Sequence, residues 1–382
     1  LHVSLAYKKC NFTLKINGMS RALFFITVTM VFFSCNKTLE RQLVFLDEYT
    51  LKDSVFFKSS VVGGLSGIDY SNGSYYLVVD DAKNPRFLKA KITIDKRKIT
   101  GVHFENIVLL NDTTTLFYKE NTLDLESIFV DEEKQQINFS SEGAIRKGRK
   151  PTIFTTDFNG RFVSEYQLPK NLLNLEHIKH NGVLEGSSKS IDTKGFWAVM
   201  EAPLKNDGVE PTFTRTQSPV RITYFNTETK KATKQFAYQL EPITKAAKGN
   251  MNLNGVTAIL EYELNKFFII ERTYQNGYGA YGNTIRIFDA EITAKTSNIL
   301  NLDALKSSKY QPLKKRLLID FDSVKDRLTD GVIDNIEGIS LGPILENGNR
   351  SLVLVSDDNF QMFGKQLNQF ILLEIVKNNT YF

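Results

Sequence analysis

Cysteine and histidine are scarce in this sequence, with 2 cysteines and 4 histidines among 382 residues. Structural zinc sites need clusters of these residues, and the pair His177 and His180 has nothing nearby to complete one. Cys10 and Cys35 both lie near the N-terminus, so the remaining chain has no disulfide framework. Its stability must therefore come from core burial and backbone hydrogen bonding.

Other signatures of known chemistry are also missing. No G-x-x-x-x-G-K-[ST] sequence is present, which excludes a phosphate-binding P-loop. The GLSG sequence at 64–67 lacks the spacing of a serine nucleophile elbow, and we expect no such elbow. No basic stripe with interleaved aromatic residues stands out, so we expect no nucleic-acid partner.

Acidic residues are absent from the first 34 positions, and an apolar run from Ala22 to Phe33 follows Met19 and Arg21. This pattern predicts a secretory signal, and the run is too short to span a bilayer comfortably. A membrane anchor helix is the alternative. The four basic residues of this segment supply most of the net charge of +5, leaving about +1 for the rest.

The sequence FFSCNK resembles the lipobox of bacterial lipoproteins. By that resemblance Cys35 becomes the lipidated N-terminus, and the protein is exported and anchored to an envelope membrane, which we expect to be the outer membrane. The predicted organisation is upstream translation or a misplaced start over 1–18, a signal peptide over 19–34, a tether over 35–50 and one domain over 51–382.

Apolar residues alternate with polar ones in many short segments rich in β-branched and aromatic side chains, and turn residues separate them. Such dense strands favour an all-β sandwich, barrel or propeller. The segments are 75–80, 127–131, 135–140, 196–201, 221–226, 266–272, 285–290, 351–357 and 369–375.

A weak internal repeat favours the propeller. Its unit is a short apolar strand, a turn and a second apolar strand that ends in an acid, and copies start roughly 50–80 residues apart. In a propeller the first strand of each blade lines the central channel, so acids at equivalent positions would converge there. We predict a β-propeller with six blades and an acidic channel. The copies are GLSGIDYSNGSYYLVVDD, LDLESIFVDEEKQQINFSSEG, GVLEGSSKSIDTKGFWAVMEAP, NGVTAILEYELNKFFIIER and NIEGISLGPILENGNRSLVLVSDD.

The order of these motifs, together with PTIFTTDFNGRFVSEYQLP and QFILLEI, resembles the bacterial family named for the esterase-like activity of phytase. The resemblance covers roughly Leu51 to Val376. It implies a β-propeller related to calcium-dependent phytases, and hydrolysis of phosphoesters or other esters.

With zinc, P-loop and serine-nucleophile sites excluded, metal binding through carboxylate oxygens is the remaining possibility. The many acids at repeated positions suit Ca²⁺. Glu126, Glu185 and Glu337 are the preferred ligands because each opens a repeat, whereas Glu142 and Glu271 each close one. The predicted metal set is Glu126, Glu142, Glu185, Glu271, Glu337, Asp357 and Asp81, and the further candidates are Asp80, Glu201 and Asp358.

Anion-binding candidates are Arg86 and Arg272, since each lies close to a repeat acid and a guanidinium grips phosphate with paired hydrogen bonds. The predicted catalytic set is therefore Glu337, Glu126, Arg272 and Arg86. The aromatic and glycine-rich loop 273–283 is either a lip over the channel or an ordinary hairpin loop.

Three functions fit these residues. The first is a Ca²⁺-dependent hydrolase of phosphomonoesters or related esters, acting as a monomer on a small molecule. The second is a lactonase or carboxylic esterase on the same metal propeller. The third is a non-catalytic binding module at the cell surface, because a fold does not fix its chemistry.

Overall fold

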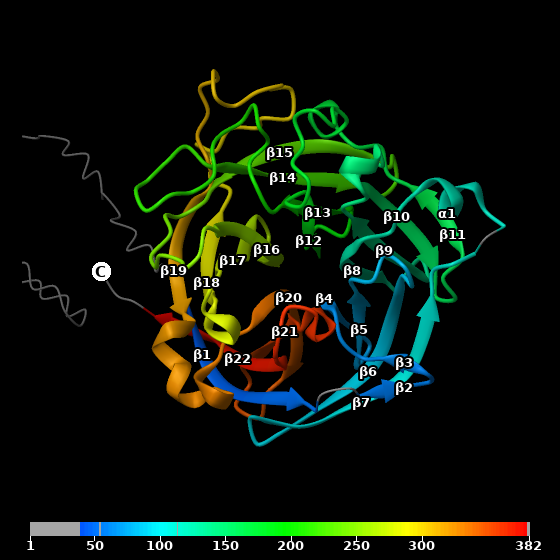
Figure 1. The fold of residues 1–382 in the computed structure, drawn as a ribbon, viewed down its shortest axis with the longest axis vertical. Helices are drawn as coiled ribbons and strands as arrows, with labels where there is room; N and C mark the ends of the chain where they lie inside the picture. The colour runs from blue at the N-terminus through cyan, green and yellow to red at the C-terminus, as the bar shows by residue number, and fades with distance from the viewer. Residues whose placement is uncertain (1–38, 53–54, 113, 380–382) are drawn as a thin grey trace, which may run out of the picture. The chain divides into compact units, whose positions relative to one another are not determined.

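Each copy of the sequence repeat lies within one four-stranded sheet, and five such sheets surround a common centre in the described part of the chain (Figure 1). The computed structural model describes residues 39–52, 55–112 and 114–379. Strands that follow one another in a sheet pair in antiparallel fashion, and the first strand of each sheet contacts the first strands of two neighbours. The fold is therefore a five-bladed β-propeller.

The strands are numbered along the chain. Blade 1 contains β4 (Leu65–Ser71), β5 (Ser74–Val79), β6 (Arg86–Asp95) and β7 (Lys98–Leu109). Blade 2 contains β8 (Leu125–Asp131), β9 (Gln136–Ser141), β10 (Thr152–Asp157) and β11 (Phe162–Glu165). Blade 3 contains β12 (Leu184–Lys189), β13 (Gly195–Met200), β14 (Pro219–Asn226) and β15 (Lys231–Gln239). Blade 4 contains β16 (Asn252–Glu263), β17 (Lys266–Gln275), β18 (Asn283–Glu291) and β19 (Lys314–Asp320). Blade 5 contains β20 (Asn335–Ile344), β21 (Arg350–Asp357), β22 (Asn368–Asn379) and β1 (Leu39–Leu51).

The remaining elements are short connections. They are the hairpin β2 (Phe56–Phe57) and β3 (Ser60–Val61), the helix α1 (Leu116–Glu120), and the 3₁₀ turns η1 (Ile145–Lys147), η2 (Lys170–Leu172), η3 (Gly279–Tyr281), η4 (Phe321–Arg327), η5 (Thr329–Gly331) and η6 (Asn359–Gln361). Within the described ranges, no helix has the length and apolar character needed to cross a bilayer.

Blade 5 closes the ring because it combines both ends of the described chain: β1 is its outermost strand, beside β22. Residues 39–50 were predicted to belong to a tether, and that prediction is wrong because they form this strand. The predicted count of six blades is also wrong. Five copies of the repeat are present, and each supplies the first two strands of one blade.

The hydrophobic core is divided among the interfaces between blades. The ring centroids of Phe129 in blade 2 and Phe196 in blade 3 are 4.7 Å apart. Those of Trp197 in blade 3 and Phe267 in blade 4 are 5.1 Å apart. Alternation along each strand places apolar side chains on both faces of the sheets, where the neighbouring blades bury them. All nine predicted strand segments coincide with observed strands.

The first strands of adjacent blades approach one another very closely. A Cβ atom on Gly186 of β12 would lie 2.9 Å from the Ala258 Cα of β16, and one on Gly67 of β4 would lie 3.0 Å from the Glu126 carbonyl oxygen of β8. Only glycine fits at such a separation. These contacts draw the five inner strands into a narrow ring, so groups carried at its rim lie near one another.

Candidate metal centre and active site

Each of the five inner strands contains a β-bulge at an equivalent place, which is the second or third residue of four strands and the sixth residue of the longer β16. A bulge adds one residue that leaves the ladder and re-aims its side chain. The bulged residues are Ser66, Glu126, Glu185, Thr257 and Glu337. Three blades therefore supply a glutamate, and these are the three residues that the sequence repeat predicted as the best ligands.

A second set of equivalent positions lies on the second strand of blades 4 and 5 and directly after the second strand of blades 1, 2 and 3. The residue before each bulge pairs with a residue of the second strand, and the second set consists of the next residue along that strand. In chain order these next residues are Asp80, Glu142, Glu201, Arg272 and Asp357. Blades 1, 2, 3 and 5 supply an acid at this position, whereas blade 4 supplies an arginine.

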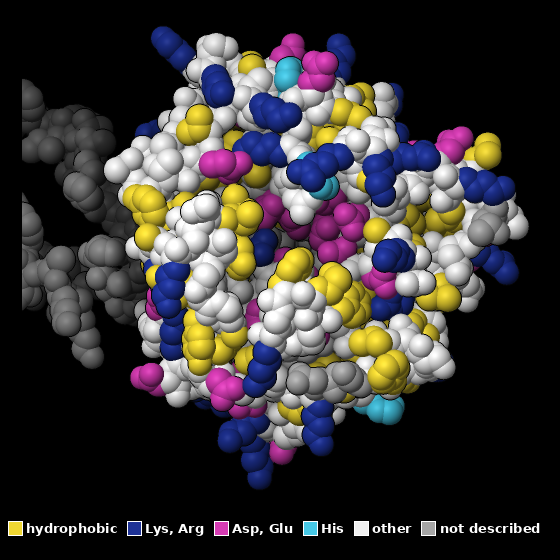
Figure 2. Space-filling model, viewed as in Figure 1, with side chains coloured by type: hydrophobic (Ala, Val, Ile, Leu, Met, Phe, Trp, Pro, Cys, Tyr) yellow, Lys and Arg dark blue, Asp and Glu magenta, His cyan; other side chains and the backbone are white. Residues whose placement is uncertain are grey.

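Together with Asp124, the acids of both sets form what we call the acidic cluster: Asp80, Asp124, Glu126, Glu142, Glu185, Glu201, Glu337 and Asp357. Figure 2 shows acidic side chains gathered in the hollow at the centre of this face. Each of these carboxylates is buried or half-buried. Burying so many like charges is unfavourable unless they are protonated or bound to a cation.

The pKa values of the cluster show this cost. Burial raises the pKa of Asp80 to about 9, with repulsion from Asp124 and Asp357 adding to the effect. Burial and the charge of Glu185 raise the pKa of Glu126 well above its ordinary value. The pKa of Glu142 is raised to about 7 by burial, despite hydrogen bonds from two backbone amides.

The geometry of the cluster fits a hard cation. One carboxylate oxygen each from Asp80, Asp124 and Glu126 lies within 4.8 Å of the others. Two ligands at roughly 2.4 Å from one Ca²⁺ can be at most about 4.8 Å apart, so these three can share an ion. The donors are all oxygens, which favours calcium over zinc or copper.

Arg272 is the only cationic side chain that forms an ion pair with the cluster, among residues 39–52, 55–112 and 114–379. Its Nη2 donates to Glu201 Oε1 at 3.1 Å and lies 3.8 Å from Glu337 Oε1, while Nη1 donates to Asn335 Oδ1. Its Nε is buried and has no hydrogen-bond partner within the same residues. One guanidinium cannot neutralise eight carboxylates.

Glu337 is held on one side only. Asn335 Nδ2 donates to its Oε1 at 2.8 Å, and no donor from the described chain contacts its Oε2. Burial raises the pKa of Glu337 to about 7, although Arg272 opposes the shift. A carboxylate with a free oxygen and a pKa near neutrality suits either metal binding or proton transfer.

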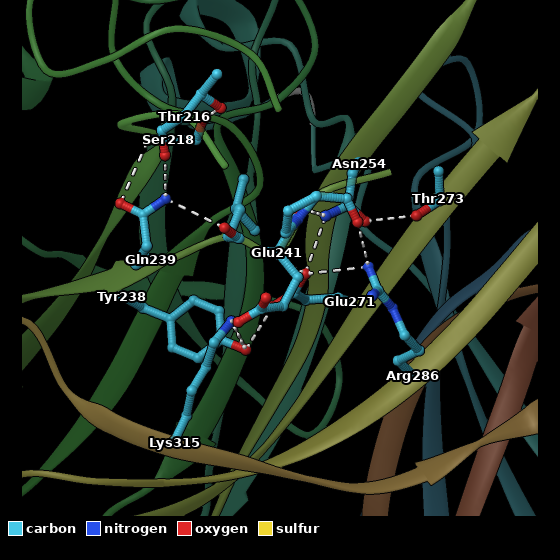
Figure 3. Close-up of polar contacts among 12 residues, drawn as sticks. Thr216, Ser218, Tyr238, Gln239, Glu241, Asn254, Glu271, Thr273, Arg286 and Lys315 are labelled. Atoms are coloured by element: carbon cyan, nitrogen blue, oxygen red, sulfur yellow. Dashed lines mark hydrogen bonds and ion pairs between the residues drawn. The ribbon is translucent and has the colours of Figure 1, made fainter. Parts of the chain in front are cut away.

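Glu271 was predicted in this metal set, but the structure places it elsewhere (Figure 3). Its carboxylate accepts hydrogen bonds from Tyr238 Oη and Lys315 Nζ, both at 2.7 Å, and from Asn254 Nδ2 at 2.9 Å. Burial alone would raise the pKa of Glu271, but the charges of Lys315 and Arg286 and the hydrogen bonds from Lys315 and Asn254 together outweigh it, and the pKa is lowered. The equivalent residue in the repeat is Arg272, one position later.

Asp81 and Arg86 are paired with each other. Arg86 Nη1 donates to Asp81 Oδ2 at 2.7 Å and to the carbonyl of Asn84 at 2.8 Å, and its Nη2 donates to the carbonyl of Val61 at 3.2 Å. Burial would raise the pKa of Asp81, but hydrogen bonds from Arg86 and Asn84 lower it. Both side chains thus order the loop after β5, and the predicted roles in metal and anion binding gain no support from their contacts.

The sequence-based set missed Asp124. Asp124 directly precedes β8. No other blade has an acid at the equivalent position, where the residues are Gly64, Val183, Gly255 and Asn335. The only signal was the alternation in LDLESIF, where Asp124 and Glu126 are two residues apart and so face the same side of an extended chain. Asp358, a further candidate, instead accepts hydrogen bonds from backbone amides.

A serine elbow was not expected, yet residues 338–342 read GISLG and match the G-x-S-x-G spacing. The match lies inside β20 rather than at a turn between a strand and a helix, which an elbow requires. Ser340 is buried, and its hydroxyl donates to the Leu341 carbonyl at 3.1 Å. The expectation that the G-x-S-x-G spacing is missing was therefore wrong, but this match lacks the structural context of an elbow.

Beneath the cluster the inner strands leave little space. A cavity of about 10 Å³, lined by Glu126 and Glu337 among others, separates the cluster from a larger cavity of about 290 Å³. The larger cavity lies farther along the same strands, between Ile68, Ile128 and Ile339. The carboxylates thus meet solvent on their own face of the propeller (Figure 2).

These features define a β-propeller with a carboxylate cluster at one end of its inner strands. The chain belongs to the phytase-like family described as esterase-like activity of phytase, which it matches over residues 60–360. No curated protein matches the chain.

Several solved structures are similar to the chain at a low level. They include exo-β-1,3-galactanase from Phanerochaete chrysosporium (TM-score 0.46, 10% identity, 87% of this chain and 64% of that one), xylan β-1,4-xylosidase from Bacillus halodurans (0.40, 10%, 77% and 49%) and the Dos1 propeller (0.32, 9%, 83% and 69%). The chain thus spans less than two thirds of the first two proteins.

Proposed function

We propose that the acidic cluster binds Ca²⁺ and that the protein is a metal-dependent hydrolase of phosphomonoesters or related esters. The observation that carries the proposal is the imbalance of charge, since eight buried or half-buried carboxylates from four blades have one ion-paired arginine between them. The family to which the chain belongs supports ester hydrolysis. Asp80, Asp124 and Glu126 would hold the ion, with Glu142, Glu185 and Asp357 close by.

Bound Ca²⁺ would supply positive charge that stabilises the charge developing on the ester in the transition state. Glu337 has a free Oε2 and a pKa near 7, so it accepts a proton from the attacking water. Arg272 lies beside Glu337 and would place its positive charge near an oxygen of the substrate. Asn335 orients both residues by accepting from Arg272 and donating to Glu337.

The pairing of Arg272 favours a second candidate, a lactonase or carboxylic esterase. Glu201 and Glu337 already balance its charge, and Arg86 is committed to Asp81. A dianionic phosphate would therefore find no uncompensated arginine at the cluster in the described chain. A neutral ester needs none, and only its transition state carries negative charge.

A substrate panel tests the proposal. Purified protein would be assayed on an aryl phosphate, a lactone and an acyl ester, each with Ca²⁺ and with excess chelator. Activity on at least one class that chelation abolishes is expected. A protein that binds calcium and turns over none of the three would leave only the non-catalytic binding module.

Export and membrane anchoring through Cys35 remain proposals, because residues 1–38 lie outside the described part of the chain. FFSCNK is the feature that supports them. A fatty-acid probe should label the protein in a Gram-negative host, and Cys35→Ala should abolish the labelling. Labelling that persists in this variant would rule the anchor out.

A further inference from the structure

The loop between β21 and β22 carries the two most exposed large apolar side chains of the described residues, Met362 at 71% and Phe363 at 77%. It begins directly after Asp357 of the acidic cluster. Figure 1 shows this loop near the centre of the ring, beside the start of β4, and Figure 2 shows hydrophobic side chains bordering the acidic hollow. Large apolar groups left in water at such a place mark a binding surface.

The base of the loop is fixed by hydrogen bonds. Asp358 Oδ1 accepts from the Gly64 amide at 2.8 Å and from the Phe360 amide at 3.2 Å. Gln361 closes the other side, since its Oε1 accepts from the Gln366 amide at 2.8 Å and its Nε2 donates to the Gln366 carbonyl at 2.9 Å. Residues 362–365 therefore project from a fixed base.

The backbone at the base is strained. Asn359, Phe360 and Gln361 have φ values of 45°, 49° and 63°, a left-handed conformation that asparagine tolerates but that is unfavourable for phenylalanine and glutamine. Such strain persists only where surrounding contacts enforce it, and it concentrates at functional sites. Asp357 Oδ1 contributes one of these contacts, because it accepts from the Asn359 amide at 2.7 Å.

The loop is also held against blade 1 beside the cluster. A Cβ atom on Gly64 would lie 2.5 Å from the Phe360 ring, so the ring packs directly on that backbone. The carbonyl of Gly64 in turn accepts from the Asp80 amide at 2.7 Å. The strained turn therefore lies between two members of the cluster, Asp80 and Asp357.

We propose that Met362 and Phe363 bind the apolar part of the substrate while the cluster holds its ester group. This inference rests on the proposed function and narrows its substrate class to esters with an apolar alcohol or acyl portion. The fixed base explains how a loop tip provides a surface with little loss of conformational entropy on binding.

Alkylphosphonates test the inference, because their anionic head mimics both a phosphoester and the tetrahedral transition state of a carboxylic ester. Binding of methylphosphonate and butylphosphonate would be followed by phosphorus NMR with Ca²⁺ present. The wild-type protein should bind butylphosphonate about fiftyfold more tightly, because three further methylenes leave water. Met362→Ser combined with Phe363→Ser should remove this preference and leave methylphosphonate binding unchanged.

The matched control is Ile344→Ser, an exposed side chain at the end of β20 away from the cluster, which should leave the preference intact. Unchanged thermal melting would show that the variants fold. Equal wild-type affinity for the two phosphonates would overturn the inference alone. Binding of neither, with calcium bound, would overturn the proposed anion site and the inference with it.

Discussion

Glu271 and Arg272 are neighbours in the sequence but point to opposite sides of β17. Arg272 reaches Glu201 and Glu337 in the acidic cluster, whereas Glu271 is buried between blades 3 and 4 against Lys315 and Tyr238 (Figure 3). Alternation along a strand produces this separation. Arg272 thus belongs to the candidate site, whereas Glu271, one position earlier, joins two blades.

Glu271→Gln tests the structural role. The change removes the charge that neutralises Lys315 and Arg286, so the free energy of unfolding should fall by about 3 kcal/mol, as when one partner of a buried pair is lost. Denaturant unfolding measures it, and calcium affinity should not change. Glu126→Gln is the control, since relieving repulsion in the cluster should stabilise the metal-free protein. A stable Glu271→Gln protein with weakened calcium binding would reverse our assignment.

Calcium should stabilise the folded protein, because the cluster exists only when the five blades have assembled. A ligand at a hundred times its dissociation constant adds about 2.7 kcal/mol, which corresponds to a rise of about 5 °C in the melting temperature. Melting curves with Ca²⁺ and with chelator measure the effect, and Asp124→Asn should reduce it. Superimposed curves for the wild-type protein would contradict the metal site.

The sequence allowed the propeller and most of the cluster to be predicted, because both follow from local pattern. Glu126, Glu185 and Glu337 stand before a short apolar run in each copy of the repeat, and a bulge at one place in every inner strand turns them inward. The five copies also gave the true number of blades, although we expected six.

Register and tertiary contacts could not be predicted in the same way. Glu271 closes its repeat as Glu142 does, and only the pairing of Val256 with Glu271 shows that Arg272 is the equivalent residue. Asp124 joins the cluster through proximity to Asp80, which is 44 positions away in sequence. The pairing of Asp81 with Arg86 likewise depends on the shape of one loop.

The stability of the chelated protein should fall as the pH rises. The folded pKa values of Asp80 and Glu142 are raised to about 9 and about 7, so the folded state binds more protons than the unfolded chain above pH of about 4. Their contribution is fully present below that pH and is lost as the pH rises through 7 and 9. Urea midpoints from pH 5 to 9 would show the decline. Asp80→Asn should flatten it, and a midpoint that rises across this range would contradict the raised values.

Glu337→Gln should lower kcat by roughly a hundredfold or more if Glu337 takes the proton from water. The amide keeps the size of the side chain and can still hydrogen bond, so folding should be preserved. If the residue is mainly a ligand, added calcium should restore part of the activity. A variant with wild-type kcat at every calcium concentration would remove Glu337 from the mechanism.

Arg272→Ala distinguishes the two candidate substrate classes. If the guanidinium of Arg272 attracts a phosphate oxygen, the variant should raise KM for an aryl phosphate about tenfold or more, in line with a lost charge-assisted interaction. Turnover of a lactone or acyl ester should change little. Arg272→Lys is the matched control, because it keeps the charge opposite Glu201 and Glu337 but loses the paired donors. Equal losses on all substrates, with calcium affinity also changed, would show instead that Arg272 serves to balance the charge of the cluster.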